Sequence, residues 1–313
     1  MIEVFSNTKI YVLCLSNHTA GGIESLHQVA CKLRSLRIDA KMYFYPNVSN
    51  PTIQPSYKKY KPVTTDLIDD AAHNILIIPE IFIGPLLDQF KKIRKIIWWL
   101  STEYYLLQTK AGAPGLDFII ERPFFNLVQS EHTRNYLLTH NVAVHGYLSG
   151  HINSVFLKEG GKEIKKTSNS ILYNPKKGFE FTSKIIAAMP GSMWRPIENM
   201  APHQIKKALA ASKVYVDFGN HPGRDRLPRE AAMMKCCIIT GKRGTAAFHE
   251  DVPIPEEFKF DEATADITCI VEKIATCISD YENQIQHFKA YHEMVSNEEE
   301  RMRMDLKRIF VKQ

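Results

Sequence analysis

The stretch that decides the fold is VYVDFGNHPGRDRLPREAAMMKCCIITGKRG, residues 214–244. Its two ends, residues 214–218 and 237–240, are apolar runs of β-type residues, which predict two buried strands. A polar loop and a helix lie between them, so the stretch predicts a strand, loop, helix and strand in succession. Open α/β sheets bind ligands at the carboxyl ends of their strands, and the loop stands at such a place.

The charges of this loop suit a phosphorylated ligand. It carries Arg224, Asp225, Arg226, Arg229 and Glu230. Three arginines at a helix amino terminus favour a diphosphate, because the helix dipole and the free N–H groups add to the guanidinium groups. A carboxylate at the helix start can accept hydrogen bonds from a ribose or sugar diol. Phosphate and diol together are the chemistry of a nucleotide sugar, whereas the alternative is a solvated loop between two core strands.

The beginning of the chain has a similar pattern. The apolar run 10–15 is followed by the loop 16–22 and by a helix with one apolar face. Gly21 and Gly22 let a bound group approach the backbone, although a tight turn alone also favours glycine. Further strand-like runs occur at residues 40–45, 75–78, 96–100, 118–120 and 127–129. Their alternation with helical segments predicts a parallel sheet covered by helices.

Breaks in composition set the expected domain boundaries. Residues 45–66 are polar and contain four prolines, which predicts a long loop. Residues 158–170 have the character of a linker, and a second α/β series begins after them. We therefore expect one Rossmann-like domain over residues 1–157 and a second over residues 158–280. Two amphipathic helices are expected over residues 281–313.

The loop motif resembles the donor-binding segment of GT-B glycosyltransferases. It is most similar to bacterial polysaccharide-cluster glycosyltransferases with a HPG-K/R-DR-PREAA signature, here at residues 221–232. The resemblance implies an α/β GT-B fold of two Rossmann-like domains that face each other across a cleft, with C-terminal helices crossing back. It also implies that Glu230 binds the nucleotide ribose, and that Gly21 and Gly22 approach the donor or the acceptor from the first domain.

A second donor-binding segment follows the strand predicted at residues 170–174. It contains Asn174, Lys176, Lys177 and Gly178. In retaining GT-B enzymes the corresponding segment carries a lysine that stabilises the leaving diphosphate, so the resemblance implies this role for Lys176 or Lys177. A cation placed there would lower the barrier by a few kcal/mol, as negative charge develops on the phosphate. The alternative is two lysines on a surface turn.

One position departs from the family pattern. Many retaining GT-B enzymes pair two glutamates as E-x7-E, and Pro222 stands where the first would be. His221 and Gly223 flank it, so the donor sugar would be recognised through backbone N–H groups or Asp225. The resemblance favours a retaining hexosyltransferase, while this departure leaves the sugar and the stereochemical outcome open.

In the first domain, Glu103 is the expected catalytic residue. It closely follows a predicted strand, where a carboxylate can orient an acceptor hydroxyl or act as a base, or else cap the next helix. Trp98 and Trp99 precede it and suit either a sugar ring or the core. Residues 130–133 form another strand-to-helix junction, for which a helix cap is the simpler interpretation.

Composition restricts the class of protein. With 44% apolar and 24% charged residues, the 313-residue chain has the composition of a soluble globular protein. The longest apolar stretch, residues 75–87, is interrupted by two prolines and a glutamate, so no membrane span is predicted. The amino terminus lacks the features of a signal peptide, which favours a cytoplasmic location. The six cysteines form no C-x-x-C pair and are expected to be reduced core thiols.

Missing motifs exclude other enzyme classes. The sequence contains no D-x-D, which disfavours the metal-dependent GT-A architecture, and we expect neither a metal nor a cofactor. It also lacks G-x-G-x-x-G, G-x-x-x-x-G-K-[ST] and G-x-S-x-G, the fingerprints of nicotinamide dehydrogenases, P-loop ATPases and serine hydrolases. No zinc-finger or RNP1-type pattern indicates nucleic acid.

Lysine and arginine cluster at residues 91–95, between the apolar Leu86, Leu87, Phe90 and Ile93. The pattern of residues 86–100 predicts an amphipathic helix that leads into the strand expected at residues 96–100. Such a helix favours peripheral contact with an anionic membrane at the inner face of the cell. An ordinary helix with a solvated basic face is the alternative.

The sequence therefore predicts a metal-independent GT-B glycosyltransferase. It would move a sugar from a nucleotide diphosphate donor to a surface polysaccharide or a lipid-linked glycan precursor. Two alternatives remain open. One is a nucleotide-sugar epimerase or hydrolase of the same fold, and the other is a non-catalytic sugar-nucleotide-binding subunit of a glycan assembly complex.

Overall fold

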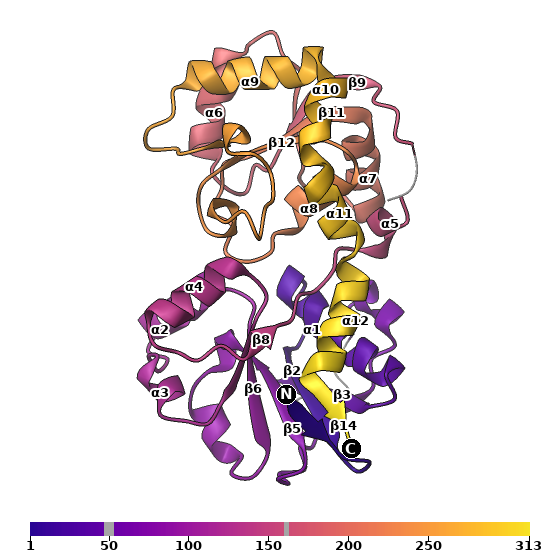
Figure 1. Ribbon diagram of the computed structural model, residues 1–313, viewed down its shortest axis with the longest axis vertical. Coiled ribbons are helices and arrows are strands. Elements are labelled where there is room, and N and C mark those ends of the chain that lie inside the picture. The colour runs from indigo at the N-terminus through magenta and orange to yellow at the C-terminus, as the bar shows by residue number, and fades with distance from the viewer. Residues whose placement is uncertain (47–52, 160–162) are drawn as a thin grey trace. The chain divides into compact units, whose positions relative to one another are not determined.

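The computed structural model describes residues 1–46, 53–159 and 163–313. The chain forms two compact units. Unit 1 comprises Met1–His151 and Glu299–Gln313, and unit 2 comprises Ile152–Glu298. The chain thus returns to unit 1 after completing unit 2, so that both ends of the chain belong to unit 1 (Figure 1).

In the described part of the chain, unit 1 contains a seven-stranded sheet in the order β4-β3-β2-β5-β6-β7-β8. All neighbouring strands in it are parallel. The strands are β2 (Lys9–Leu15), β3 (Asp39–Tyr45), β4 (Thr64–Thr65), β5 (Ile75–Pro79), β6 (Arg94–Trp99), β7 (Phe125–Val128) and β8 (Gly146–Tyr147). From β2 the chain first adds strands on one side of the sheet and then on the other. The topological switch point, where such sheets bind ligands, therefore lies between β2 and β5.

The helices of unit 1 connect these strands, except for α12, which follows unit 2 in the sequence and leads into β14 (Figure 1). They are α1 (Gly21–Ser35), η1 (Pro55–Tyr60), η2 (Glu80–Phe82), η3 (Pro85–Gln89), α2 (Thr102–Lys110), α3 (Asp117–Ile120), α4 (Glu131–Thr139) and α12 (Glu298–Ile309). A small parallel pair, β1 (Ile2–Val4) and β14 (Phe310–Lys312), joins the two ends of the chain.

Both faces of the unit 1 sheet are buried. Alternate residues of β5 enter opposite cores, with Ile77 on the α1 side and Leu76 on the other. Trp98 and Trp99 follow the same alternation in β6, and both are fully buried. Their indole N–H groups donate to the Leu148 carbonyl at 2.8 Å and to Asn126 at 3.2 Å. The two tryptophans are therefore core residues and present no surface to a sugar.

Two predictions of local structure in unit 1 were wrong. Residues 118–120 belong to the short helix α3, because β6 pairs directly with β7 and leaves no place between them for another strand. Periodicity cannot distinguish so short an apolar run from a helical turn. The proline-rich segment 45–66 is likewise not loop throughout. It contains η1, whose Tyr57 and Tyr60 are buried in the core, and the edge strand β4, whereas residues 47–52 lie outside the described part.

The amphipathic helix expected within residues 86–100, before the strand at residues 96–100, does not form. The short helix η3 ends before the basic residues, and the chain then turns into β6. The carboxylate of Asp70 fixes this turn by accepting hydrogen bonds of 2.8–2.9 Å from the backbone N–H groups of residues 91–93. Leu87 and Ile93 are buried in the core. The apolar residues that were expected to meet a membrane thus pack against the sheet instead.

Unit 2 contains a five-stranded parallel sheet in the order β10-β9-β11-β12-β13. Its strands are β9 (Ser168–Tyr173), β10 (Trp194–Pro196), β11 (Ser212–Asp217), β12 (Cys237–Gly241) and β13 (Lys259–Phe260). Its helices are α5 (Ser154–Leu157), α6 (Phe179–Ala188), α7 (Pro202–Ala211), α8 (Arg226–Met233), η4 (Thr245–Ala247), η5 (Glu256–Phe258), α9 (Ile267–Ser279), α10 (Tyr281–Gln284), η6 (Ile285–Phe288) and α11 (Lys289–Ser296). From β9 the chain adds β10 on one side of the sheet and then β11 on the other. The switch point of this sheet therefore lies between β9 and β11.

The division between the units differs from the expected boundaries at residues 158 and 281. It falls earlier at the first crossing because Phe156 of α5 is buried in the core of unit 2. It falls later at the second because Tyr291 and Val295 of α11 enter the same core. Of the expected terminal helices, α12 alone returns to unit 1, where its apolar face is buried in the core.

No helix in the described ranges is long and apolar enough to cross a bilayer.

Candidate functional site

Three loops of unit 2 meet at the carboxyl edge of its sheet. They follow β9 (residues 174–178), β11 (residues 218–225) and β12 (residues 242–245). The first two flank the switch point, and an isolated bridge between His221 and Gly244 joins the second to the third. The predicted donor-binding residues of unit 2 all lie on these loops or in the first turns of α8.

Glycines allow the first two loops to touch through their backbones. Gly178 has a left-handed φ of 58°, and a Cβ atom on it would lie 2.2 Å from the carbonyl oxygen of Phe218. A Cβ atom on Gly219 would lie 2.1 Å from the side chain of Lys177. No residue with a side chain fits at either position without moving the neighbouring loop. The two glycines thus set the distance between the loops at the switch point.

We expect Gly178→Ala to destabilise the protein by more than about 2 kcal/mol, since a left-handed alanine costs roughly 1–2 kcal/mol before the clash with Phe218 is counted. Urea denaturation measures the loss. Gly191→Ala is the matched control, because a Cβ atom there has no neighbour within 4 Å in the described structure. Equal stability of the two variants would show that the loops are not held at this distance.

Lys177 lies at the centre of this edge and Lys176 does not. The Lys177 ammonium group forms an ion pair with Asp225, the residue that precedes α8. Lys176 is exposed, and its backbone N–H donates to the side chain of Asn174 at 3.1 Å. Asn174 is buried and shapes the turn. Between the two lysines that the sequence left undecided, Lys177 is therefore the one held against the loop after β11.

A buried polar cluster supports the loop after β11 from inside the sheet. Asp217, the last residue of β11, accepts a 2.6 Å hydrogen bond from Tyr215 and lies 3.6 Å from His221. Burial alone would raise the pKa of Asp217, but the neighbouring His221 and the Tyr215 hydroxyl lower it below its usual value. Burial alone would lower the pKa of His221, and the Asp217 carboxylate raises it. The two therefore favour the charged pair.

This cluster changes the role expected for His221. The residue is only 1% exposed, so it supports the loop rather than meeting a ligand at its surface. Gly223 is likewise buried, and its carbonyl accepts a 2.8 Å hydrogen bond from Thr245 of the third loop. Asp217 was not singled out in the sequence. A lone carboxylate that ends the apolar run VYVD was the available signal.

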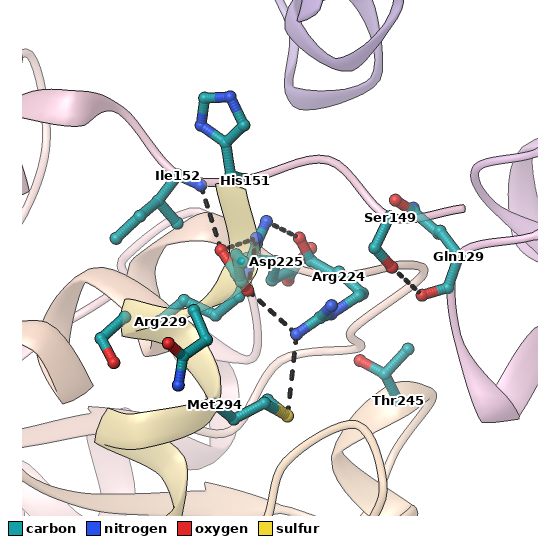
Figure 2. A network of polar contacts seen from close by, with 12 residues as sticks. Gln129, Ser149, His151, Ile152, Arg224, Asp225, Arg229, Thr245 and Met294 are labelled. Atoms are coloured by element: carbon teal, nitrogen blue, oxygen red, sulfur yellow. Dashed lines mark hydrogen bonds and ion pairs between the residues drawn. The ribbon is translucent and has the colours of Figure 1, made fainter. Parts of the chain in front are cut away.

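Arg224 and Arg229, which the sequence predicted to neutralise a diphosphate, are paired inside unit 2. Both guanidinium groups bind the buried carboxylate of Glu298, at 2.9 Å from Arg224 and at 2.9 and 3.0 Å from Arg229. Arg224 also lies 3.9 Å from the sulfur of Met294 (Figure 2). The two cations share this carboxylate, because a buried charge requires a partner.

Glu298 also holds the start of unit 2. It accepts a 3.1 Å hydrogen bond from the backbone N–H of Ile152, the first residue of this unit. Glu298 is the first residue of α12 and the last residue of unit 2, so one carboxylate connects the two ends of this unit with the segment around the start of α8. Arg224 and Arg229 are conformational anchors of that loop.

Arg226 and Glu230 lie on α8. Arg226 is exposed, and Glu230, one turn further, is 95% buried with a relative exposure of 5%. The carboxylate of Asp225 makes no capping hydrogen bond to α8, since it pairs with Lys177 instead. Burial raises the pKa of Tyr215 well above its usual value, and Asp225 and Glu230 are among the carboxylates that raise it further.

In unit 1, the loop after β2 leads to Gly21 and Gly22 at the start of α1, beside the switch point. A Cβ atom on Gly22 would lie 3.2 Å from the side chain of Leu100. Ala20 precedes the helix and cannot cap it with a side chain. Gly21 and Gly22 are half-buried at the start of α1, and packing against Leu100 supplies a structural reason for the second of them.

Glu103 lies in the first turn of α2 and hydrogen-bonds His132 at 3.1 Å. It does not cap its helix, because Ser101 does so by accepting the N–H of Tyr104 at 3.2 Å. Ser130 caps α4 in the same way. Of the two roles that the sequence left open for Glu103, the cap is excluded.

Glu80 was not predicted from the sequence as a candidate site residue. It follows β5 at the switch point of unit 1 and is 2% exposed. Burial raises its pKa to about 8, against the effect of the backbone N–H groups that it binds, including that of Leu100 at 2.8 Å. Its carboxyl group fixes the turn between β6 and α2. A charged residue directly after the apolar run ILIIP was the available signal.

No family model and no curated protein matches the chain by sequence. Its structure, in contrast, is similar to several solved structures. Sucrose-phosphate synthase from Thermosynechococcus elongatus matches with a TM-score of 0.66 at 12% identity, covering 96% of this chain and 98% of that chain. HepE of Anabaena, solved in complex with UDP-glucose, matches with a TM-score of 0.66 at 10% identity over the same shares of both chains.

A third similar structure is BGT of phage T4 in complex with its UDP-glucose substrate, with a TM-score of 0.51 at 9% identity. It too covers 96% of this chain and 98% of its own. These matches extend over nearly the whole chain and include both units. The chain therefore has the α/β GT-B fold expected from its sequence.

Proposed function

We propose that this protein is a metal-independent glycosyltransferase that uses a nucleotide diphosphate sugar. The observation that carries the proposal is the convergence of three loops at the switch point of unit 2, where Lys177 is held beside the start of α8. Loops at this place in a parallel sheet bind ligands, and a helix amino terminus favours phosphate. Unit 2 would hold the donor, and unit 1 would hold the acceptor.

Lys177 is the cation assigned to the leaving diphosphate. It is half-buried and paired with Asp225, so its position is fixed before a ligand arrives. Arg226 is the second cation, since it is exposed, whereas Arg224 and Arg229 are buried and bound to Glu298. Two cations and the N–H groups of a helix start supply the charge stabilisation that a metal ion would otherwise give.

The fold favours a uridine nucleotide as the first donor to test. HepE and BGT, which share this fold, were solved with UDP-glucose. The acceptor is proposed to be a surface polysaccharide or a lipid-linked glycan precursor, on the strength of the motif at residues 221–232.

Glu230 is proposed to bind the ribose of the nucleotide. We expect Glu230→Gln to weaken UDP binding by roughly 1.5–3 kcal/mol, or about 10- to 150-fold in Kd, because a charged hydrogen bond to the diol is lost. Isothermal titration calorimetry measures this loss. 2′-Deoxy-UDP serves as the control ligand, since its affinity should change less on the same substitution.

The opposite pattern would remove Glu230 from the donor site. If UDP bound Glu230→Gln as tightly as the unmodified protein while the melting temperature fell, the carboxylate would be a structural residue beneath α8. The convergence of the three loops would still have to be explained by another ligand.

We also propose peripheral binding to an anionic membrane at the inner face of the cell, through fewer basic residues than the sequence suggested. Lys91 and Lys92 are exposed beside a groove of about 540 Å³. Arg94 donates to the carbonyls of Glu3 and His73 at 2.7 and 2.6 Å, so its charge is directed into unit 1.

Co-sedimentation with phosphatidylserine vesicles at low salt tests membrane binding. Replacing Lys91 and Lys92 with Gln should weaken it roughly 30-fold, at about 1 kcal/mol per basic residue. Lys184→Gln with Lys207→Gln is the charge-matched control, because both residues are exposed on unit 2. Equal binding by the two double variants, or no binding by the unmodified protein, would exclude this membrane surface.

A further inference from the structure

Glu103 and His132 form a pair at the carboxyl edge of the unit 1 sheet. They lie in the first turns of α2 and α4, which follow the neighbouring strands β6 and β7. The Nε2 atom of His132 lies 3.1 Å from Oε1 of Glu103. Two elements that are separate in the sequence thus bring a carboxylate and an imidazole together where parallel sheets bind substrates.

The two helix starts are held rigidly. Thr102 donates a 3.2 Å hydrogen bond to Thr133, which joins the first turn of α2 to that of α4. Ser101 and Ser130 cap the two helices. Behind them, Glu80 binds the backbone N–H of Leu100. A side chain on such a scaffold has a fixed direction, which is what a catalytic group requires.

One oxygen of Glu103 is held and the other is not. Oε1 binds His132, whereas Oε2 is buried and accepts no hydrogen bond from the residues that the structure describes. The whole side chain is nevertheless 26% exposed, so it borders solvent. A buried carboxylate oxygen without a donor is costly. A substrate hydroxyl would supply the missing hydrogen bond.

We propose that Glu103, oriented by His132, is the general base that activates the acceptor hydroxyl, and that glycosyl transfer inverts the anomeric configuration. The inference rests on the proposed function, because it assumes a nucleotide-sugar donor. It assigns Glu103 the catalytic role and His132 a positioning role. It also contradicts the retaining outcome that the sequence resemblance favours.

The reaction is a single displacement. Oε2 of Glu103 takes the proton of the acceptor hydroxyl, and the hydroxyl oxygen forms a bond to the anomeric carbon of the donor. The bond from that carbon to the diphosphate breaks, and the diphosphate leaves with the electron pair. Attack from the face opposite the leaving group inverts the configuration once. Pro222, at the place of the first glutamate in the E-x7-E pattern, agrees with a route that needs no such group on the donor side.

The test uses UDP-glucose with water as the acceptor, so that no natural acceptor is needed. Proton NMR of the first glucose released should show the β anomer, since the donor is α-linked. Glu103→Gln should lower kcat by about 10²- to 10⁴-fold and leave the Kd for UDP unchanged. His132→Ala should lower kcat by less, and His132→Gln, which keeps an N–H donor, should restore most of the loss.

Glu131→Gln is the matched control, because Glu131 lies in the first turn of the neighbouring helix α4 but is bound by Arg134 at 2.8 Å. α-Glucose as the first product, or Glu103→Gln turning over as fast as the control, would overturn the inference and leave the proposed transferase intact. Bound UDP-glucose that is never cleaved would overturn both. No binding of UDP at all would remove the proposed function itself.

Discussion

Glu298→Gln is expected to destabilise unit 2 by about 3–5 kcal/mol, the cost of removing one partner from a buried ion pair. The carboxylate is 1% exposed and pairs with two buried guanidinium groups, those of Arg224 and Arg229. Glutamine has the same shape but no charge, so both buried arginines would lose this ionic partner. The Ile152 N–H would keep an oxygen acceptor, and the variant therefore isolates the effect of the charge.

Urea denaturation followed by circular dichroism measures this loss. Glu299→Gln is the control, because the Glu299 carboxylate pairs with Lys32 at a partly exposed site. Losing this ion pair should cost less than about 1 kcal/mol of stability. Replacing Glu298, Arg224 and Arg229 together with apolar residues should recover part of the stability, because no uncompensated charge then remains. Equal stability of Glu298→Gln and Glu299→Gln would show that the arginines are not anchored in this way.

Lys177→Ala is expected to lower kcat by about 10²- to 10³-fold, with a much smaller change in the Kd for the nucleotide. The reason is that negative charge on the leaving diphosphate grows toward the transition state, so the cation binds it more strongly there than in the ground state. Lys176→Ala should be nearly silent, because that side chain is exposed, whereas Lys177 pairs with Asp225.

Initial rates with UDP-glucose and calorimetry with UDP separate the two effects. The variant also leaves Asp225 without its partner, so its melting temperature must be compared with that of the unmodified protein. Lys177→Arg, which keeps the charge, should retain part of the activity. Full activity in Lys177→Ala, or an equal loss in Lys176→Ala, would remove the lysine from the leaving-group site.

Much of the fold could be predicted because its strands are local patterns. Buried parallel strands are nearly continuous apolar runs, and β2, β5, β11 and β12 stand out in the sequence for that reason. The boundaries of the units were less accessible. They depend on which core the side chains of α5 and α11 enter, and a linker-like composition at residues 158–170 does not reveal that.

The candidate site was predicted in its position but not in its charges. The loop 218–225 was recognised, and Lys177 and Glu230 lie beside it. The partner of Arg224 and Arg229 could not be found, because Glu298 is some seventy residues away and nothing local connects them. The pairing of Glu103 with His132 could not be predicted either, because the two side chains meet only through the neighbouring strands β6 and β7 of the folded sheet.

Calorimetric titration with UDP, GDP, CDP and ADP in the presence of EDTA tests whether the protein binds a nucleotide without a metal ion. We expect one of these nucleotides, with UDP the first candidate, to bind once per chain. At 100 times its Kd it should stabilise the protein by about 2.7 kcal/mol. We also expect Lys177→Ala to lower kcat with the corresponding nucleotide sugar, and Glu230→Gln to weaken binding of the nucleotide. The absence of binding by all four nucleotides, or binding that requires a divalent metal ion, would contradict a metal-independent nucleotide-sugar transferase.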